Sequence, residues 1–389
     1  MPISKELLEK ISQNTFTEKH LDLKGQMLKD VDIFELTKAL ENNRYIKAID
    51  LSYNDIGDNG IKELAKNKQI EELNLSNGIS GYDDHYNHIT AVGIKFLAQS
   101  NLNKLNLNGN PIGDEGIKHL ATSKNMTELD VEDCNISADG LCFLLKINTS
   151  LKRLNVSSNE IEDKGLSTIA DNHTLEELDL SMCKITGEST RFIEKNDSLV
   201  RLQLAENDIG QGAGRLANHV KIKFLGLGQC NVCDDALFFF GENKTIKELV
   251  LSYNKITTKG LKAISKNSVL TALHVGHNDI FFDEQIINNL ISMKSLLVFT
   301  GEDNSVSDKV KQHIEKLCKK SSIKQFDLTI HNGIKNTEFI TYHFEGSKSN
   351  KRKHDKTDKQ QAIEGQLLDI TNQESKDNKK LNTGYTPLN

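Results

Sequence analysis

Residues 151–161, LKRLNVSSNEI, and residues 175–185, LEELDLSMCKI, carry the same pattern, L-x-x-L-x-L-x-x-N/C-x-I, and this pattern decides the fold. Nine near-complete copies occur in the chain, and consecutive copies are mostly 23 to 25 residues apart. The copies begin at Ile46, Leu102, Met126, Leu151, Leu175, Leu199, Ile222, Ile246 and Leu270. A further copy, from Ile70, is interrupted, because the step from Asn54 to Asn87 is 33 residues, nine more than the usual 24. Self-similarity at a fixed period of this length is the signature of a solenoid.

The periodicity inside one copy predicts its secondary structure. The L-x-L core alternates with period two, which predicts a short strand with its leucines pointing inward. Between copies, segments such as residues 113–125 and 257–267 place apolar residues at i, i+3 and i+4, which predicts a two-turn helix. Strands joined by such crossovers run in one direction and stack into a curved sheet. We therefore predict an α/β solenoid with a parallel concave β-sheet and convex helices.

Two further columns of residues recur at fixed places in the copies. One alternates between asparagine and cysteine, whose inward side chains can bond backbone groups that a turn leaves unpaired. Its members are Asn110, Cys134, Asn159, Cys183, Asn207, Cys230 and Asn254. The other is a column of glycines, which fits either close packing between turns of the coil or a backbone angle that a side chain would penalise. Its members are Gly60, Gly93, Gly116, Gly140, Gly165 and Gly260.

The alternation of Asn and Cys resembles the ribonuclease-inhibitor class of leucine-rich repeats. The 24-residue period with G-[IL]-K-x-[LI]-[AS] is more similar to the GALA-type repeats of effectors that bacterial pathogens inject into host cells. The resemblance covers roughly residues 46 to 300. It implies a leucine-rich-repeat scaffold that binds a protein, in this case a secreted virulence effector that binds a host protein in the host cytoplasm. One scaffold serves many unrelated partners, so the resemblance is specific for the fold rather than for the function.

Composition divides the chain into four parts. Residues 1–20 are expected to form an N-terminal capping helix, and residues 21–300 a solenoid of about twelve repeats. Residues 301–345 are expected to form a C-terminal cap, with a helix over residues 306–317 and a strand pair around Asn332 and Gly333. Residues 346–389 hold nine Lys/Arg and six Asp/Glu with few apolar residues, which predicts a disordered polar tail.

Charge and composition exclude several classes of protein. A formal charge of −6 argues against a nucleic-acid binder. The chain has no apolar run near the roughly 18 residues that a membrane span needs, and its N-terminus lacks the apolar stretch of a cleaved signal peptide. Six cysteines are sparse for 389 residues, which favours a reduced, cytoplasmic protein. A Ser-His-Asp order, H-E-x-x-H and a kinase-like loop are all missing, so we expect no enzyme, no cofactor and no small-molecule substrate.

Four local motifs have a structural explanation that outweighs a functional one. Cys230 and Cys233 form a single CxxC, while a zinc site needs two more ligands. The glycines of residues 210–214 lack the lysine of a phosphate-binding loop. The insertion, with Tyr82, Asp83, Asp84, His85, Tyr86 and His88, is expected to add contact area for a partner rather than to bind a metal. Residues 348–356 are Lys-rich, which fits a polar tail and, with less weight, a targeting signal.

The concave strand positions are the best candidates for binding a partner. In the middle copies they are acidic, with Asp130, Glu132 and Asp179 as candidates for steering a partner's approach. Toward the C-terminus aromatic and small residues replace the charges, as in the core of a protein interface. The candidate anchors are Phe224, Val250, Tyr253, His274 and His277. The two histidines predict binding that depends on pH between about 5.5 and 7.

Two other functions remain open from the sequence. The first is a GTPase-activating protein that resembles the Ran regulator, with Arg153 or Arg201 on the concave columns as the arginine it would need. The second is an adaptor for ubiquitin ligases.

Overall fold

The computed structural model describes residues 3–77, 86–318, 321–331, 337–338 and 341–343. Contacts divide the chain into two units, Met1–Phe344 and Glu345–Asn389, and all the repeats belong to the first unit. The predicted disordered tail and residues 78–85 of the insertion lie outside the described residues.

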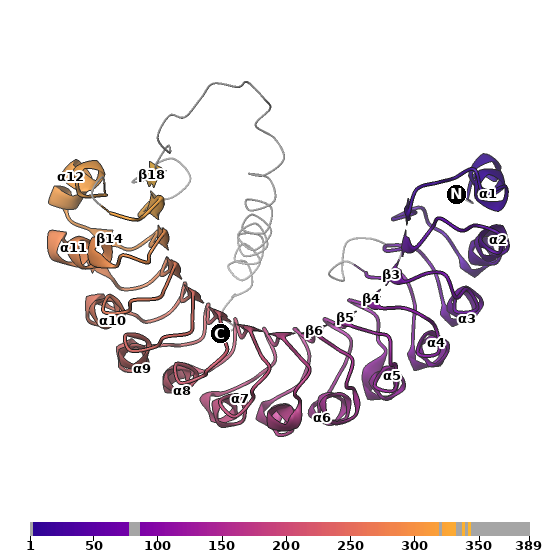
Figure 1. Ribbon diagram of the computed structural model, residues 1–389, viewed down its shortest axis with the longest axis horizontal. Coiled ribbons are helices and arrows are strands. Elements are labelled where there is room, and N and C mark those ends of the chain that lie inside the picture. The colour runs from indigo at the N-terminus through magenta and orange to yellow at the C-terminus, as the bar shows by residue number, and fades with distance from the viewer. Residues whose placement is uncertain (1–2, 78–85, 319–320, 332–336, 339–340, 344–389) are drawn as a thin grey trace, which may run out of the picture. The chain divides into compact units, whose positions relative to one another are not determined.

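Thirteen parallel strands form one sheet, and the predicted fold class is confirmed. Each strand pairs with the next in chain order, with the middle leucine, isoleucine or phenylalanine of one opposite that of its neighbour. Figure 1 shows the strands on the inner side of the coil and the helices on its outer side. The strands are β1 (His20–Asp22), β2 (Ala48–Asp50), β3 (Glu72–Asn74), β4 (Lys104–Asn106), β5 (Glu128–Asp130), β6 (Arg153–Asn155), β7 (Glu177–Asp179), β8 (Arg201–Gln203), β9 (Phe224–Gly226), β10 (Glu248–Val250), β11 (Ala272–His274), β13 (Val298–Thr300) and β15 (Gln325–Asp327).

The C-terminal end of the sheet is closed by a strand of opposite direction. β15 pairs in parallel with β13 on one side and antiparallel with β18 (Thr341–His343) on the other. Two short ladders accompany it: β12 (Phe281–Phe282) with β14 (Ser305–Val306), and β16 (Ile330–His331) with β17 (Thr337–Glu338). The segment expected to belong to the cap therefore also supplies the last parallel strand, while Asn332 and Gly333 lie outside the described residues.

The outer side carries one helical segment in most repeats. Regular helices are α1 (Lys5–Ser12), α2 (Asp30–Leu40), α3 (Asp58–Leu64), α4 (Ala91–Leu97), α5 (Gly113–Leu120), α6 (Ala138–Ile147), α9 (Asp234–Phe240), α10 (Thr258–Ile264), α11 (Glu284–Ser292) and α12 (Asp308–Cys318). The expected two-turn helix is wrong for three central repeats, which hold short 3₁₀ and α turns instead. These are η1 (Asp163–Leu166), η2 (Ile169–Asp171), η3 (Gly187–Ser189), α7 (Thr190–Ile193), η4 (Gly210–Gly212) and α8 (Ala213–Leu216).

Close backbone contact explains the glycines in two of these turns. A Cβ on Gly212 would lie 2.5 Å from the Cα of Gly187, and one on Gly187 would lie 2.6 Å from the carbonyl oxygen of Ile209. The backbones of neighbouring repeats thus meet where a side chain has no room. Within residues 210–214, Gly212 is explained by this packing and Gly210 by its positive φ of 49°.

The predicted register places the leucines in the core. Leu178, in the middle of β7, is 3% exposed, and Leu180 is fully buried. A register shifted by one residue would turn both toward solvent. The leucine, isoleucine and valine positions of successive repeats form one continuous core from Ile3 to Leu328.

The Asn/Cys column connects each repeat to the one before it. The thiol of Cys134 donates to the carbonyl oxygen of Leu107 at 3.2 Å. The amide of Asn159, one repeat later, donates to the carbonyl oxygen of Val131 at 2.8 Å. Its Oδ1 accepts the backbone N–H groups of Cys134 at 3.1 Å and Ile136 at 2.9 Å. A cysteine can donate but does not supply this acceptor, so each cysteine repeat depends on the asparagine that follows it.

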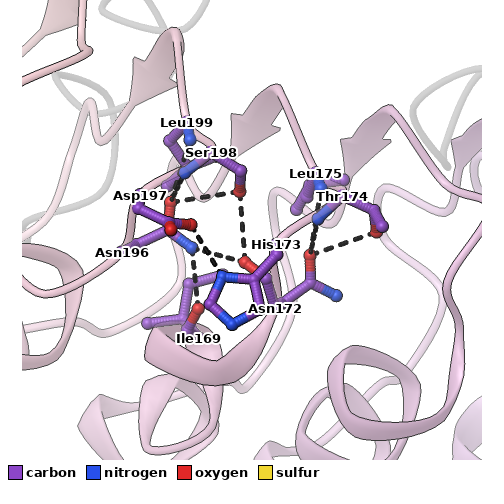
Figure 2. Close-up of polar contacts among 9 residues, drawn as sticks. All are labelled: Ile169, Asn172, His173, Thr174, Leu175, Asn196, Asp197, Ser198 and Leu199. Carbon is purple, nitrogen blue, oxygen red and sulfur yellow. Dashed lines mark hydrogen bonds and ion pairs between the residues drawn. The ribbon is translucent and has the colours of Figure 1, made fainter.

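A second asparagine column, which the sequence analysis missed, orders the outer turns (Figure 2). Asn196 donates to the carbonyl oxygens of Ile169 at 2.8 Å and Asn172 at 2.7 Å. Its Oδ1 accepts the N–H groups of Ser198 and Leu199, each at 2.9 Å. The signal was present in the sequence as an asparagine three residues before the first leucine of a copy. The column holds Asn43, Asn67, Asn148, Asn172, Asn196, Asn243 and Asn267.

The structure also decides why the glycine column exists. A Cβ on Gly93 would lie 2.5 Å from Oδ1 of Asp58 in the preceding repeat, and one on Gly60 would lie 2.7 Å from Oδ1 of Asp30. The Asp58 carboxylate accepts the N–H of Gly93 at 3.0 Å and the hydroxyl of Thr90 at 2.6 Å. Close packing between turns of the coil is therefore the reason for these two glycines, since neither has a positive φ; a Cβ on Gly116 would instead lie 2.8 Å from Ile112 of its own repeat.

Candidate protein-interaction surface

Four positions in each repeat form what we call the inner face. They are the first and third residues of each parallel strand, and the second and third residues after that strand. The strand's middle residue and the residue directly after the strand point into the core, as Leu249 and Leu251 do in the repeat of β10. Figure 1 shows that no helix lies over this side of the sheet within the described part of the chain.

The inner face is strongly acidic. It holds fourteen Asp and Glu residues and four Lys and Arg residues, a formal charge of −10. The acidic residues are Asp22, Asp50, Glu72, Glu128, Asp130, Glu132, Asp133, Glu177, Asp179, Glu206, Glu248, Glu302, Asp303 and Asp327. The basic residues are Lys24, Lys104, Arg153 and Arg201.

The first position of each strand holds a ladder of alternating charges from β3 to β8. Lys104 lies 3.8 Å from Glu72 and 3.4 Å from Glu128, measured between ammonium nitrogen and carboxylate oxygen. Arg153 also pairs with Glu128. The charges of these side chains are therefore neutralised by other residues of the same chain.

Arg201 is the last residue of this ladder and lies next to the aromatic region. Its guanidinium lies 3.8 Å from the carboxylate of Glu177 and 4.0 Å from the ring centroid of Phe224. Both arginines considered for a GTPase-activating role, Arg153 and Arg201, are thus engaged within the sheet. Phe224 is half-buried, with its ring against a cation that the same chain supplies.

The third position of each strand gives two acidic candidates a structural role. Oδ1 of Asp130 accepts the N–H of Glu132 at 3.2 Å. Oδ1 of Asp179 accepts the N–H of Ser181 at 2.9 Å and its hydroxyl at 2.7 Å. Asn155 on the strand between them makes the same contact with the N–H of Ser157. These carboxylates therefore hold the backbone as it leaves the strand, besides contributing charge to the inner face.

Asp130, Glu132 and Asp179 form a group of carboxylates that repel one another. Burial raises the pKa of all three, and the charges of Asp130 and Asp179 raise the pKa of Glu132 further. The amide of Asn108 donates to Glu132 at 3.0 Å. The ion pairs of the described residues leave all three carboxylates without a Lys or Arg partner. The three candidates thus lie together on or just after β5 and on β7, at the middle of the inner face.

The five anchor candidates lie together on the neighbouring strands β9, β10 and β11 or just after them. The rings of Tyr253 and His277 are stacked, with centroids 4.0 Å apart and planes 10° apart. Nε2 of His277 lies 3.3 Å from the carboxylate of Asp303. Val250 and His274 are half-buried neighbours in the sheet, paired across β10 and β11. These residues form an aromatic and aliphatic region that also includes one carboxylate, because Glu248 on β10 lies opposite Phe224.

One expectation about this region is wrong for His274. Burial lowers the pKa of His274 to about 4, and Nδ1 lies 3.1 Å from the hydroxyl of Thr300. The side chain is therefore neutral throughout pH 5.5 to 7 in the free protein. The predicted pH dependence of binding in that range cannot come from this residue.

Glycines leave room for two long polar side chains at the borders of the aromatic region. A Cβ on Gly226 would overlap Oε1 of Gln203, so the amide lies flat on the neighbouring strand. The Glu302 carboxylate covers Gly276 in the same way. Gln203 Oε1 and Glu302 Oε2 are buried without a hydrogen-bond partner within the described part of the chain. The placement of Gln203 and Glu302 is not evident from the sequence, because it depends on a glycine in the adjacent repeat.

Both cysteines of the CxxC occupy structural positions in the repeat. Cys230 fills the Asn/Cys column, its thiol donates to the carbonyl oxygen of Leu204 at 3.0 Å, and burial raises its pKa to about 12. Cys233 precedes α9 as its N-cap residue. Among the residues that the structure describes, no group of three or more His, Cys, Asp or Glu could hold a metal ion. His88 is exposed, with its Nε2 3.6 Å from Asp55, while Tyr82 to His85 lie outside the described residues.

Within the described ranges, no helix has the length and apolar character that crossing a membrane requires.

Comparison with known proteins identifies the repeats. A family model described as Leucine Rich repeat matches residues 42–65, 99–121, 122–144, 148–170, 171–189 and 242–265. No curated protein matches the sequence. The structure is similar to an internalin from Listeria monocytogenes, at 19% identity and a TM-score of 0.53 over 82% of this chain and 88% of that one.

Two other solved structures match with lower TM-scores. A leucine-rich-repeat protein from Leptospira interrogans has 21% identity and a TM-score of 0.47 over 82% of this chain and 98% of that one. The plant peptide hormone receptor RGFR1, in complex with RGF2, has 19% identity and a TM-score of 0.45 over 77% of this chain and 45% of that one. The chain contains leucine-rich repeats and has their solenoid fold. Its assignment to the ribonuclease-inhibitor-like or GALA-type class stays a prediction.

Proposed function

We propose that this protein is a non-catalytic scaffold that binds another protein through the inner face of its sheet. The observation that carries the proposal is that Phe224, Val250, Tyr253, His274 and His277 share the inner face on or just after three adjacent strands. Aromatic and aliphatic side chains on an open sheet are costly to leave in water, and they are typical of interface cores. The scaffold itself is common to many proteins that bind proteins, so the site rather than the fold supports the assignment.

We further propose a division of labour along the inner face. The aromatic region on β9–β11 anchors the partner, and Asp130, Glu132 and Asp179 steer its approach. Rim charges mostly change the rate of association and its salt dependence, while buried aromatic anchors dominate the binding energy.

We also propose that the protein acts as a secreted effector that works in the cytoplasm of a host cell. This part rests on the resemblance of residues 46–300 to GALA-type repeats. It predicts a host protein as the partner, with no nucleic acid, membrane or small-molecule substrate involved.

The experiment is affinity purification from eukaryotic lysate followed by a titration with the recovered partner. Tyr253→Ala should weaken binding about thirtyfold, since an aromatic anchor contributes about 2 kcal/mol or more. Phe238→Ala is the matched control, because Phe238 is 62% exposed on the outer helix α9. A control variant that binds within about twofold of the parent, beside a weakened Tyr253→Ala, supports the anchor.

The opposite pattern would contradict the proposal. If Tyr253→Ala binds as the parent does while deletion of residues 82–86 abolishes binding, the contact lies at the N-terminal end. Thermal unfolding of each variant shows whether loss of the Tyr253–His277 stack has affected the fold.

A further inference from the structure

The negative charge of residues 1–345 is segregated onto the inner face. Residues 1–345 hold 49 Asp/Glu and 40 Lys/Arg, a formal charge of −9, because six acidic and nine basic residues follow residue 345. The inner face alone carries −10 from fourteen acidic and four basic residues. Everything else in residues 1–345 therefore adds up to about +1. One side of the sheet accounts for the whole net charge.

The bases of the inner face do not neutralise this charge, because they are already engaged. Lys104, Arg153 and Arg201 pair with glutamates in the ladder along the first strand position. The ammonium of Lys24 lies 4.8 Å from the ring centroid of Tyr53. The carboxylates of the acidic middle have backbone amides, hydroxyls and side-chain amides as partners, as Asp179 has Ser181 and Glu132 has Asn108. Burial and mutual repulsion raise the pKa of Glu132, which is the response of a carboxylate that lacks a cation nearby.

We propose that the partner contributes a lysine- and arginine-rich segment of protein, which lies along the inner face from the acidic middle to the aromatic region. The proposal rests on the proposed function and names the chemistry of the partner. Cations on the partner would supply the counter-charges that the chain lacks on this face, and would remove the repulsion within the group of Asp130, Glu132 and Asp179. A nucleic acid or an acidic peptide would meet repulsion over the same surface.

The acidic and aromatic regions are close enough for one segment to contact both. Asp179 on β7 and Phe224 on β9 are two strands apart, which is about 10 Å at the usual spacing between strands. Arg201 between them already shows the geometry that a basic side chain adopts here, with a carboxylate on one side and an aromatic ring on the other. Side chains of the same kind on the partner would meet carboxylates on β5 and β7 and aromatic rings from β9 to β11.

The test measures binding of two defined peptides by fluorescence anisotropy at several salt concentrations. One peptide alternates lysine and arginine with glycine, and the other is a glutamate–glycine peptide of the same length. The full-length chain should bind the basic peptide, more weakly as salt increases, and should not bind the acidic one.

Two variants that remove the same amount of charge locate the binding. The inner variant is Asp130→Asn, Glu132→Gln and Asp179→Asn; asparagine keeps the backbone contact, as Asn155 shows on the intervening strand. The outer variant is Glu115→Gln, Asp139→Asn and Glu188→Gln, whose side chains are 64%, 73% and 68% exposed in the outer helical segments. The inner variant should lose roughly tenfold in affinity for the basic peptide, and the outer variant less than about twofold.

The proposal is overturned if the outer variant loses as much as the inner one, or if the acidic peptide binds as tightly as the basic peptide. It also fails if the basic peptide does not bind. In that case a recovered protein partner whose binding falls in Tyr253→Ala would leave the proposed function standing with a partner of different charge. If neither Tyr253→Ala nor the inner variant affects that protein partner, the proposed function fails as well.

Discussion

The alternation of asparagine and cysteine predicts that Asn159 cannot be replaced by cysteine, although cysteine occupies the same place in the repeats before and after it. In Asn159→Cys the thiol could still donate to the carbonyl oxygen of Val131, as Cys134 does to that of Leu107. The acceptor Oδ1 would be lost. The buried N–H groups of Cys134 and Ile136, now bonded at 3.1 and 2.9 Å, would have no partner.

The cost depends on the number of amides left unpaired. A buried donor without a partner costs about 1–3 kcal/mol, so two such donors reduce the free energy of unfolding by about 2–6 kcal/mol. Asn110→Cys is the matched control. Asn110 donates to three carbonyl oxygens just as Asn159 does, but its Oδ1 accepts a single amide, that of Ile89, at 3.3 Å. We expect Asn159→Cys to be less stable than Asn110→Cys by about 1–3 kcal/mol.

Urea unfolding under reducing conditions measures both variants, and hydrogen exchange reports on the two amides directly. Exchange at Cys134 and Ile136 should accelerate in Asn159→Cys but not in Asn110→Cys. Equal stability of the two variants within about 0.5 kcal/mol, with the amides of Cys134 and Ile136 still protected, would refute the dependence of a cysteine repeat on the asparagine after it.

Three further predictions concern the core, the glycine column and the acidic group. Leu178→Ala should lower the free energy of unfolding by about 2–5 kcal/mol in denaturant melts, because Leu178 is 3% exposed at the centre of the stack; a loss below about 0.5 kcal/mol would mean that the register is wrong. Gly93→Ala should cost about 1–3 kcal/mol, since its Cβ would lie 2.5 Å from the Asp58 carboxylate. The same substitution should cost less when Asp58 is already alanine, and an equal cost in both backgrounds would point to another cause. Asp179→Asn should stabilise the protein at pH 7, because burial raises the pKa of Asp179 in the folded state. The native carboxyl therefore favours folding only while it is protonated, and this contribution to stability is lost as the pH rises through the folded pKa. The gain should disappear below about pH 3.9, where the carboxyl is protonated in both states, and thermal melts that show the same gain at pH 3 and pH 7 would contradict this.

The repeat, its register and the direction of the strands could be predicted from the order of amino acids alone. A period of two within L-x-L and a period of 24 between copies report directly which side chains are buried, because burial is what the pattern records. The same reasoning placed Asn159 and Cys134 in one inward column and put Phe224, Tyr253 and His277 on one side of the sheet. These features follow from the sequence of a single repeat and from its regular recurrence along the chain.

The contacts between repeats could not be predicted in this way, because their partners are about 24 residues apart in the chain and become neighbours only once the coil is stacked. The glycines at positions 60 and 93 are needed because the carboxylates of Asp30 and Asp58 in the preceding repeat occupy the space of a Cβ. The second asparagine column is recognised by its hydrogen bonds to the preceding turn. Asp130 and Asp179 accept backbone N–H groups just after their strands. Burial keeps His274 neutral over the pH range in which it was expected to titrate. The segregation of charge onto the inner face likewise depends on which strand positions stacking leaves uncovered. A sequence pattern shows that a residue points inward or outward, but its hydrogen-bond partners, its pKa and the room around it depend on neighbouring repeats that only stacking brings within reach.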